Sequence, residues 1–215
     1  ESIMIFVLTI DPALGKIDKV LLSQQTLMEL FSEGITNIQL TYRYEGSNEI
    51  DNWKGLVFSA NGDIIQLLVD FLQLEGSINL QWLPSTIQLV RMCGNRLSGT
   101  LDLENLPDSL AELHLFTNRF VGSISLMKLP PEFQWLNVND NNLSGSLDLT
   151  QLPNTLQCLY LSMNGFVGMT DFSKLPESLN VLSIQFTGLE GEIISNGKLN
   201  LKTFNCKVTI VDKLV

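Results

Sequence analysis

The stretches LPNTLQCLYLSMNGFVG, residues 152–168, and LPESLNVLSIQFTGLEG, residues 175–191, begin 23 residues apart. Both open with Leu-Pro, both place apolar residues at the same steps, and both end in glycine. The pattern also begins at residues 83, 106 and 129, so five units follow one another without insertion. Self-similarity at a fixed period predicts a solenoid in which each unit forms one coil.

Each unit places its apolar residues at the fifth, eighth and tenth steps, as in Leu156, Leu159 and Leu161. The eighth and tenth residues point to the same face of a short strand, because strand side chains alternate. No single unit can bury that face alone, so neighbouring units are expected to stack around a shared core. The thirteenth residue lies where the chain turns off the strand and is asparagine in four of the five units. Its amide predicts a structural ladder along the stack, formed by Asn95, Asn118, Asn141 and Asn164.

The second half of each unit, such as LSGSLDL at 143–149, alternates apolar and polar residues and predicts a second strand. A glycine at the seventeenth step, such as Gly145, is expected to let the backbone approach the neighbouring coil closely. The Leu-Pro step that opens each unit disfavours a long helix on the convex side. The prediction is therefore a β-rich α/β solenoid with little convex helix.

The conserved spelling within the chain, L-x-x-L-x-L-x-x-N-x-L, resembles the signature of the leucine-rich repeat family over residues 83–197. The 23-residue form with LxGxIDLxxLP resembles the leucine-rich repeat proteins of trypanosomatids and related protists. The resemblance implies a right-handed superhelix with a parallel concave sheet. It also implies a small interaction module without catalytic residues.

Three regions are expected along the chain. Residues 1–59 form an N-terminal cap, with a helix at about 23–33 and a hairpin from residue 55 onward, indicated by Asn61-Gly62. Residues 198–215 form a partial repeat, whose edge strand either seals the core or is covered by a partner or by self-association. The repeats between them cover units 60–82, 83–105, 106–128, 129–151, 152–174 and 175–197.

Composition and charge exclude several classes of function. The 215-residue chain has 13 basic and 23 acidic residues, so direct binding of nucleic acid is not expected. No apolar run reaches the roughly 20 residues that a membrane-spanning helix needs. Three cysteines without a pairing pattern favour a reducing, intracellular compartment, whereas a signal peptide preceding Glu1 would place the protein outside the cell or on its surface. The single sequon, Asn142-Leu143-Ser144, is a triplet that also arises by chance.

The side chains between the buried strand residues are expected on the concave surface. His114, Phe116, Trp135 and Tyr160 fall on adjacent strands there, and such aromatic residues are typical anchors of interfaces. Single exposed aromatics are also ordinary on a sheet. The predicted partner-binding residues are Arg91, Glu112, His114, Phe116, Trp135, Asn137, Tyr160 and Ser183.

Catalysis is not expected from this pattern. His114 is the single histidine, with Glu112 on its face and Cys93 one strand away, but a flat open sheet supplies neither a pocket nor oxyanion donors. The sequence therefore predicts no catalytic residue, no metal and no cofactor. It predicts a protein-binding adaptor or structural subunit of an intracellular complex. The alternative is a secreted or cell-surface protein that recognises a host protein or a glycan.

Overall fold

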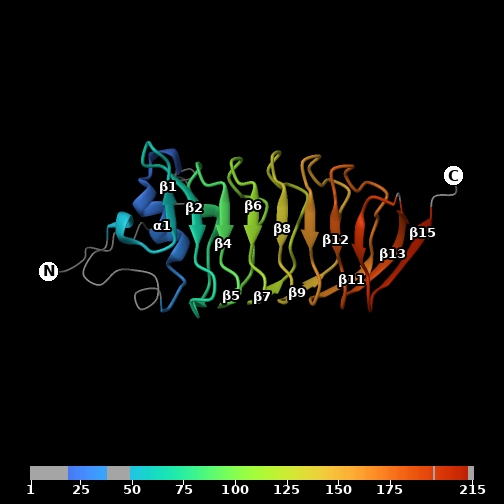
Figure 1. Ribbon diagram of the computed structural model, residues 1–215. Coiled ribbons are helices and arrows are strands. Elements are labelled where there is room, and N and C mark those ends of the chain that lie inside the picture. The colour runs from blue at the N-terminus through green and yellow to red at the C-terminus, as the bar shows by residue number, and fades with distance from the viewer. Residues whose placement is uncertain (1–18, 38–48, 196, 213–215) are drawn as a thin grey trace, which may run out of the picture.

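The computed structural model describes residues 19–37, 49–195 and 197–212. It shows a β-solenoid of about seven coils with two parallel sheets and few helices, as the repeat predicts (Figure 1). Residues 1–18 and 38–48 of the expected cap, and residues 213–215 of the expected C-terminal end, lie outside the described residues.

The first strand of each coil joins an eight-stranded sheet. Its eighth-step leucines stand side by side, because Leu113 pairs in register with Leu136, and Leu136 with Leu159. All neighbouring pairs are parallel except the first hairpin, whose loop contains Asn61 and Gly62. The strands, in spatial order, are β1 (Leu56–Phe58), β2 (Ile64–Leu68), β4 (Leu89–Arg91), β6 (Glu112–His114), β8 (Trp135–Asn137), β10 (Cys158–Tyr160), β12 (Val181–Ser183) and β14 (Asn200–Lys202).

The second strand of each coil joins a seven-stranded, all-parallel sheet. The register of this sheet is shifted by two residues between neighbouring coils. Val121, for example, pairs with Asn142 and not with Ser144, its equivalent in the repeat. The strands are β3 (Glu75–Gly76), β5 (Arg96–Gly99), β7 (Arg119–Gly122), β9 (Asn142–Gly145), β11 (Gly165–Met169), β13 (Gly188–Ser195) and β15 (Lys207–Asp212).

Backbone conformation, more than close approach of the neighbouring coil, requires glycine at the seventeenth step. Gly99, Gly122 and Gly145 have φ values of 86°, 82° and 89°. This left-handed region is costly for residues with a Cβ. A Cβ on Gly122 or Gly145 would meet a neighbouring side chain only at 3.1–3.2 Å, which a small shift relieves. The repeat therefore keeps glycine here mainly because the second strand ends in a left-handed turn.

One α-helix covers the first coil. The helix α1 (Gln24–Ser32) begins after Ser23, whose hydroxyl accepts a hydrogen bond from the Thr26 N–H at 3.1 Å. Met28 and Phe31 on its inner face are fully buried. Within the described residues, the other helices are the 3-10 turns η1 (Lys19–Leu21), η2 (Ile50–Asn52) and η3 (Leu80–Trp82).

Gly34, just after α1, is needed for packing and is not a left-handed helix cap. Glu33, the C-cap residue, has right-handed helical angles. A Cβ on Gly34 would lie 2.2 Å from the Ser77 Oγ, and the Gly34 carbonyl accepts a hydrogen bond from the Ser77 N–H at 2.9 Å. The helix end is thus pressed against the first coil.

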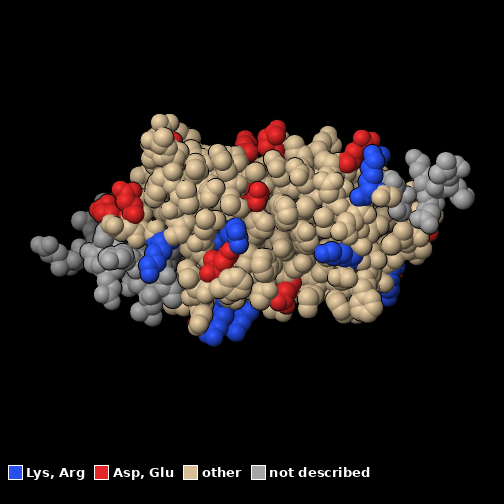
Figure 2. Space-filling model, viewed as in Figure 1, with Lys and Arg blue, Asp and Glu red and all other residues tan. Residues whose placement is uncertain are grey.

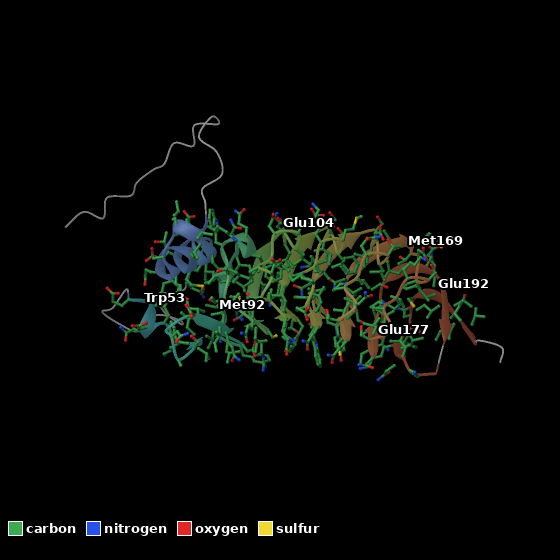
Figure 3. All side chains as sticks on the ribbon, turned by 90° about the horizontal axis from the view of Figure 1, so that it is seen from above. Trp53, Met92, Glu104, Met169, Glu177 and Glu192 are labelled. Carbon is green, nitrogen blue, oxygen red and sulfur yellow. The ribbon has the colours of Figure 1, made fainter. Side chains whose placement is uncertain are left out.

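A single apolar core runs through the stack from α1 to β13. Leu113, Leu136 and Leu159 have no exposed surface, so the eighth step points inward in each of these coils. Figure 3 shows Met92 among the interior side chains, whereas Glu104 and Glu192 lie at the periphery. Burying each such leucine contributes roughly 1.5–3 kcal/mol.

Asparagine holds the turn that leaves each strand of the eight-stranded sheet. The Asn118 Oδ1 accepts from the Leu97 N–H at 3.0 Å, and its Nδ2 donates to the Met92 and Leu115 carbonyls at 2.9 and 3.1 Å. Asn118 is 9% exposed. Equivalent bonds to the preceding coil are made by Asn95, Asn141 and Asn164.

The residue before this asparagine adopts a left-handed conformation whatever its identity. The φ values are 54° at Thr117, 53° at Asp140 and 55° at Met163, and Gly94 has 63°. Threonine and methionine have no preference for this region. The stack therefore imposes this conformation, and the coil geometry outweighs the local preference.

Candidate partner-binding face

The outer face of the eight-stranded sheet carries the predicted binding residues. Arg91 is exposed on it, while Glu112, His114, Phe116, Trp135, Asn137 and Tyr160 are partly buried. We refer to these seven residues as the candidate face. Figure 2 shows that the side of the molecule on which β4 to β12 lie in Figure 1 is largely uncharged.

Ser183 was expected on this face, but it is buried, with 2% of its surface exposed. It pairs in register with Tyr160 on one side and Lys202 on the other, and their longer side chains cover it. Its hydroxyl lies 2.6 Å from the hydroxyl of Ser162, in a buried hydrogen bond. Ser183 therefore supports the face from within and is not available to a partner.

Three rings from adjacent strands form a continuous stack, which we call the aromatic stack. The His114 and Trp135 rings are 5.6 Å apart with an angle of 42° between their planes. The Trp135 and Tyr160 rings are 5.9 Å apart and nearly parallel, at 17°. The Lys202 Nζ lies 5.8 Å from the centre of the Tyr160 ring. Pairs of this kind contribute about 0.5–1.5 kcal/mol each, so the stack is preformed.

The Trp135 ring offers its edge to a partner more than its flat faces, because neighbouring rings lie on both sides of it. Trp135 is in contact with a ring on both sides. Its Nε1 is buried and has no hydrogen-bond partner within the described residues. A flat ligand therefore has no free Trp135 face on which to lie.

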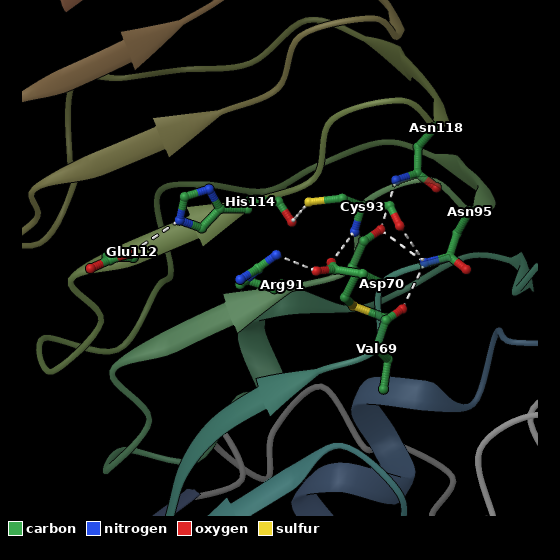
Figure 4. A network of polar contacts seen from close by, with 9 residues as sticks. Val69, Asp70, Arg91, Cys93, Asn95, Glu112, His114 and Asn118 are labelled. Carbon is green, nitrogen blue, oxygen red and sulfur yellow. Dashed lines mark hydrogen bonds and ion pairs between the residues drawn. The ribbon is translucent and has the colours of Figure 1, made fainter. Parts of the chain in front are cut away.

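The charged side chains on this face have polar partners (Figure 4). The Arg91 Nη2 lies 2.6 Å from the Asp70 Oδ2, and the His114 Nε2 lies 3.1 Å from the Glu112 Oε2. Such half-exposed pairs contribute little to stability. The pairs matter for the electrostatics of the surface, because they leave this face with little net charge on a chain whose formal charge is −10.

Two cysteines at outward steps of the repeat, Cys93 and Cys158, are buried, with 0% and 6% exposed. Burial first, and the nearby Asp70 carboxylate second, raise the pKa of the Cys93 thiol to about 12. Its Sγ donates to the His114 carbonyl at 3.4 Å and not to the imidazole (Figure 4). Burial also raises the pKa of the Cys158 thiol. The geometry thus forms no thiolate–imidazole pair at Cys93.

Two residues that contact the candidate face, Asp70 and Lys202, were missed by sequence reasoning. Asp70 is the eleventh residue of the degenerate unit 60–82, so its position in the repeat could have placed it on this surface. Lys202 pairs with Ser183, but the last coil is shorter than 23 residues, and the phase therefore could not be carried to it. Both side chains make the contacts described above with members of the candidate face.

The face has no deep cavity of its own among the cavities characterised in the described residues. A cavity of about 740 Å³ lies at the C-terminal end, lined by Phe172, Leu179 and Ile193 among others, and includes no residue of the candidate face. No cluster of three or more His, Cys, Asp or Glu side chains arranged to hold a metal occurs within residues 19–37, 49–195 and 197–212. None of the helices in these ranges has the length and apolar character needed to cross a bilayer.

Plant receptor ectodomains share this architecture. The crystal structure of a pollen receptor kinase 3 superimposes with a TM-score of 0.65 at 23% identity, covering 86% of this chain and 95% of that chain. The leucine-rich repeat ectodomain of the receptor kinase SOBIR1 from Arabidopsis thaliana gives 0.59 at 19% identity, over 86% and 95%. The Arabidopsis receptor kinase HAESA, solved with the peptide hormone IDA and the co-receptor SERK1, gives 0.57 at 21% identity, over 87% of this chain and 42% of that chain.

No protein-family model matches the sequence, and no curated protein does. The structural likeness, at these identities, shows the fold. The molecule has the β-solenoid fold of these leucine-rich repeat structures, as the sequence pattern of its units predicts.

Proposed function

We propose that this chain is a non-catalytic protein-binding module and that its partner docks on the candidate face. The observation that carries the proposal is the aromatic stack of His114, Trp135 and Tyr160, which crosses three adjacent strands in a largely uncharged surface. Tyrosine and tryptophan dominate binding energy where they are held in well-packed settings.

The mechanism is docking onto a preformed surface. The strands beneath the stack are tied in register on both sides, so little conformational entropy is lost when a partner binds. Arg91 is already paired with Asp70, and Glu112 is hydrogen-bonded to His114, so association depends on apolar contact more than on electrostatic steering. We therefore expect the affinity to change little with salt concentration.

A polypeptide fits this face better than a glycan. Sugar rings stack on free aromatic faces, whereas both faces of Trp135 are occupied by His114 and Tyr160. The structural neighbour HAESA was solved with a peptide hormone bound, which supports a polypeptide partner for the shared fold.

We place the module in an intracellular complex, as an adaptor or structural subunit. This assignment is supported by its three free thiols, Cys93, Cys158 and Cys206. A second setting, recognition of a protein outside the cell, is supported by the ectodomain structures that share the fold and by the surface position of Asn142. The trypanosomatid form of the repeat belongs to the same proposal and rests on the LxGxIDLxxLP spelling.

Affinity capture from native lysate, followed by mass spectrometry, tests the docking face. The wild-type chain is compared with Trp135→Ala and Tyr160→Ala, which are expected to lose the partner. Phe71→Ala is the matched control, because Phe71 is 68% exposed and is not part of the candidate face. Each variant is checked by circular dichroism and thermal unfolding, and we expect Tm to stay within a few degrees, because Trp135 is only partly buried. A folded Trp135→Ala protein that captures the partner as well as the wild type would overturn the proposal.

A further inference from the structure

Two consecutive asparagines, Asn141 and Asn142, have opposite environments. Asn141 is 8% exposed, and its amide belongs to the structural ladder. Asn142 opens β9 with its side chain exposed on the outside of the seven-stranded sheet. Its amide has no hydrogen-bond partner within the described residues. Ser144, two residues along the same strand, is exposed as well, so both side chains point outward from one strand face.

The surroundings of Asn142 are apolar and open. Val121 of the preceding coil pairs with Asn142 in register and is 42% exposed. On the other side, the Met163 carbonyl accepts from the Asn141 N–H at 3.2 Å, and the Met163 side chain is 53% exposed. Gly165 pairs with Ser144 and leaves the surface beside it without a side chain. Val121 and Met163 are therefore the apolar side chains that a substituent on the Asn142 amide would contact first.

We propose that Asn142 is an acceptor for an N-linked glycan and that the first sugars cover Val121 and Met163. Asn142-Leu143-Ser144 is the only Asn-x-Ser/Thr triplet in the 215 residues. In the transfer, the Asn142 amide nitrogen forms a bond to the anomeric carbon of a lipid-pyrophosphate-linked oligosaccharide. The bond between that carbon and the phosphate breaks, the lipid pyrophosphate leaves, and the amide gives up one proton.

The glycan is compatible with partner binding because of where β9 lies. In Figure 1, β9 runs along the lower edge of the view, whereas β8, which carries Trp135, belongs to the other sheet. A glycan on Asn142 therefore leaves the candidate face open. The inference rests on the second setting of the proposed function, outside the cell, because oligosaccharide transfer to asparagine takes place in the secretory pathway. It does not depend on which residues contact the partner.

Secretion of the full chain behind a cleavable signal peptide from human or insect cells tests the acceptor site. We expect the major secreted form to carry the mass of one glycan, which peptide N-glycosidase removes while converting Asn142 to aspartate. Asn142→Gln and Ser144→Ala are expected to abolish the modification. Ser144→Thr and the exposed, non-sequon variant Asn154→Gln are expected to retain it. An unmodified wild-type chain, or a glycan that persists in Asn142→Gln, overturns the assignment.

Methionine oxidation tests the covering of Met163. Dilute hydrogen peroxide converts exposed methionines to sulfoxides, and Met127, 49% exposed in a different part of the coil, is the internal control. We expect Met163 to oxidise several-fold more slowly in the glycosylated chain than after deglycosylation, with Met127 unchanged. Equal Met163 rates in the two forms refute the covering, even where the glycan itself is present.

Discussion

Removal of one ladder amide, by Asn118→Ala, is expected to destabilise the solenoid although no apolar core residue is changed. The substitution leaves the buried Leu97 N–H without a partner. The Met92 and Leu115 carbonyls each lose one donor but keep another, the Nδ2 of Asn95 and of Asn141. One unsatisfied buried polar group costs about 1–3 kcal/mol, so we expect a loss of about 2–3 kcal/mol in the free energy of unfolding. For a chain of this size the loss corresponds to a fall in Tm of roughly 5–10 °C.

Urea denaturation followed by circular dichroism measures this loss, and hydrogen exchange locates it. The Leu97 amide is expected to lose protection, because its acceptor is the Asn118 side chain. Asn142→Ala is the matched control, since Asn142 is exposed and its change is expected to stay within about 0.5 kcal/mol. A loss below about 1 kcal/mol for Asn118→Ala, or unchanged protection of the Leu97 amide, would refute the reasoning.

Three further changes test neighbouring features of the coil. Thr187, whose hydroxyl donates to the Ile184 carbonyl at 2.7 Å, replaces the ladder asparagine in the last complete unit. Thr187→Asn is expected to raise the free energy of unfolding by about 1 kcal/mol, because the new amide can accept from the Phe166 N–H. Urea denaturation measures the change, and a decrease would contradict the stabilising role of the ladder asparagines. Thr117→Gly is expected to stabilise the protein by about 0.5–1 kcal/mol in thermal unfolding, because glycine relieves the strain at a φ of 54°. A loss of stability would show that the contacts of the threonine side chain outweigh that strain. At pH 8, alkylation mapped by mass spectrometry should modify Cys206 in the native chain but Cys93, with its pKa of about 12, only after unfolding; native modification of Cys93 would contradict its burial.

The coils and their core were predictable from the sequence because apolar spacing decides which side of a strand faces inward. Leu113, Leu136 and Leu159 lie inside for that reason. The same spacing does not say how far an outward residue is covered by its neighbours. Cys158 points outward between Trp135 and Val181, and these larger side chains on the flanking strands bury it. Ser183 is buried between Tyr160 and Lys202 in the same way.

The left-handed residue where each coil turns off the eight-stranded sheet, directly before the ladder position, was not predictable from residue identity. Gly94, Asp140 and Asn205 have some preference for positive φ, whereas Phe71 and Phe186 have none, and all five adopt it. The requirement comes from the adjacent coils, whose asparagine amides bond only if every turn has the same shape. A single unit contains no information about that constraint, although its repetition at a fixed step does.

Stability and recognition depend on alternate residues of the same strands, which explains how a repeat can vary its outer face. Leu136 is fully buried, while Trp135 and Asn137, on either side of it in the strand, are partly exposed to solvent. Because the inward residues and the ladder asparagines hold neighbouring strands in register, an outward side chain is placed directly beside its counterpart in the next coil. The aromatic stack follows from that placement, since a ring in each of three successive coils must meet its neighbour. Replacing one of these rings removes a contact surface but leaves the ladder and the core intact.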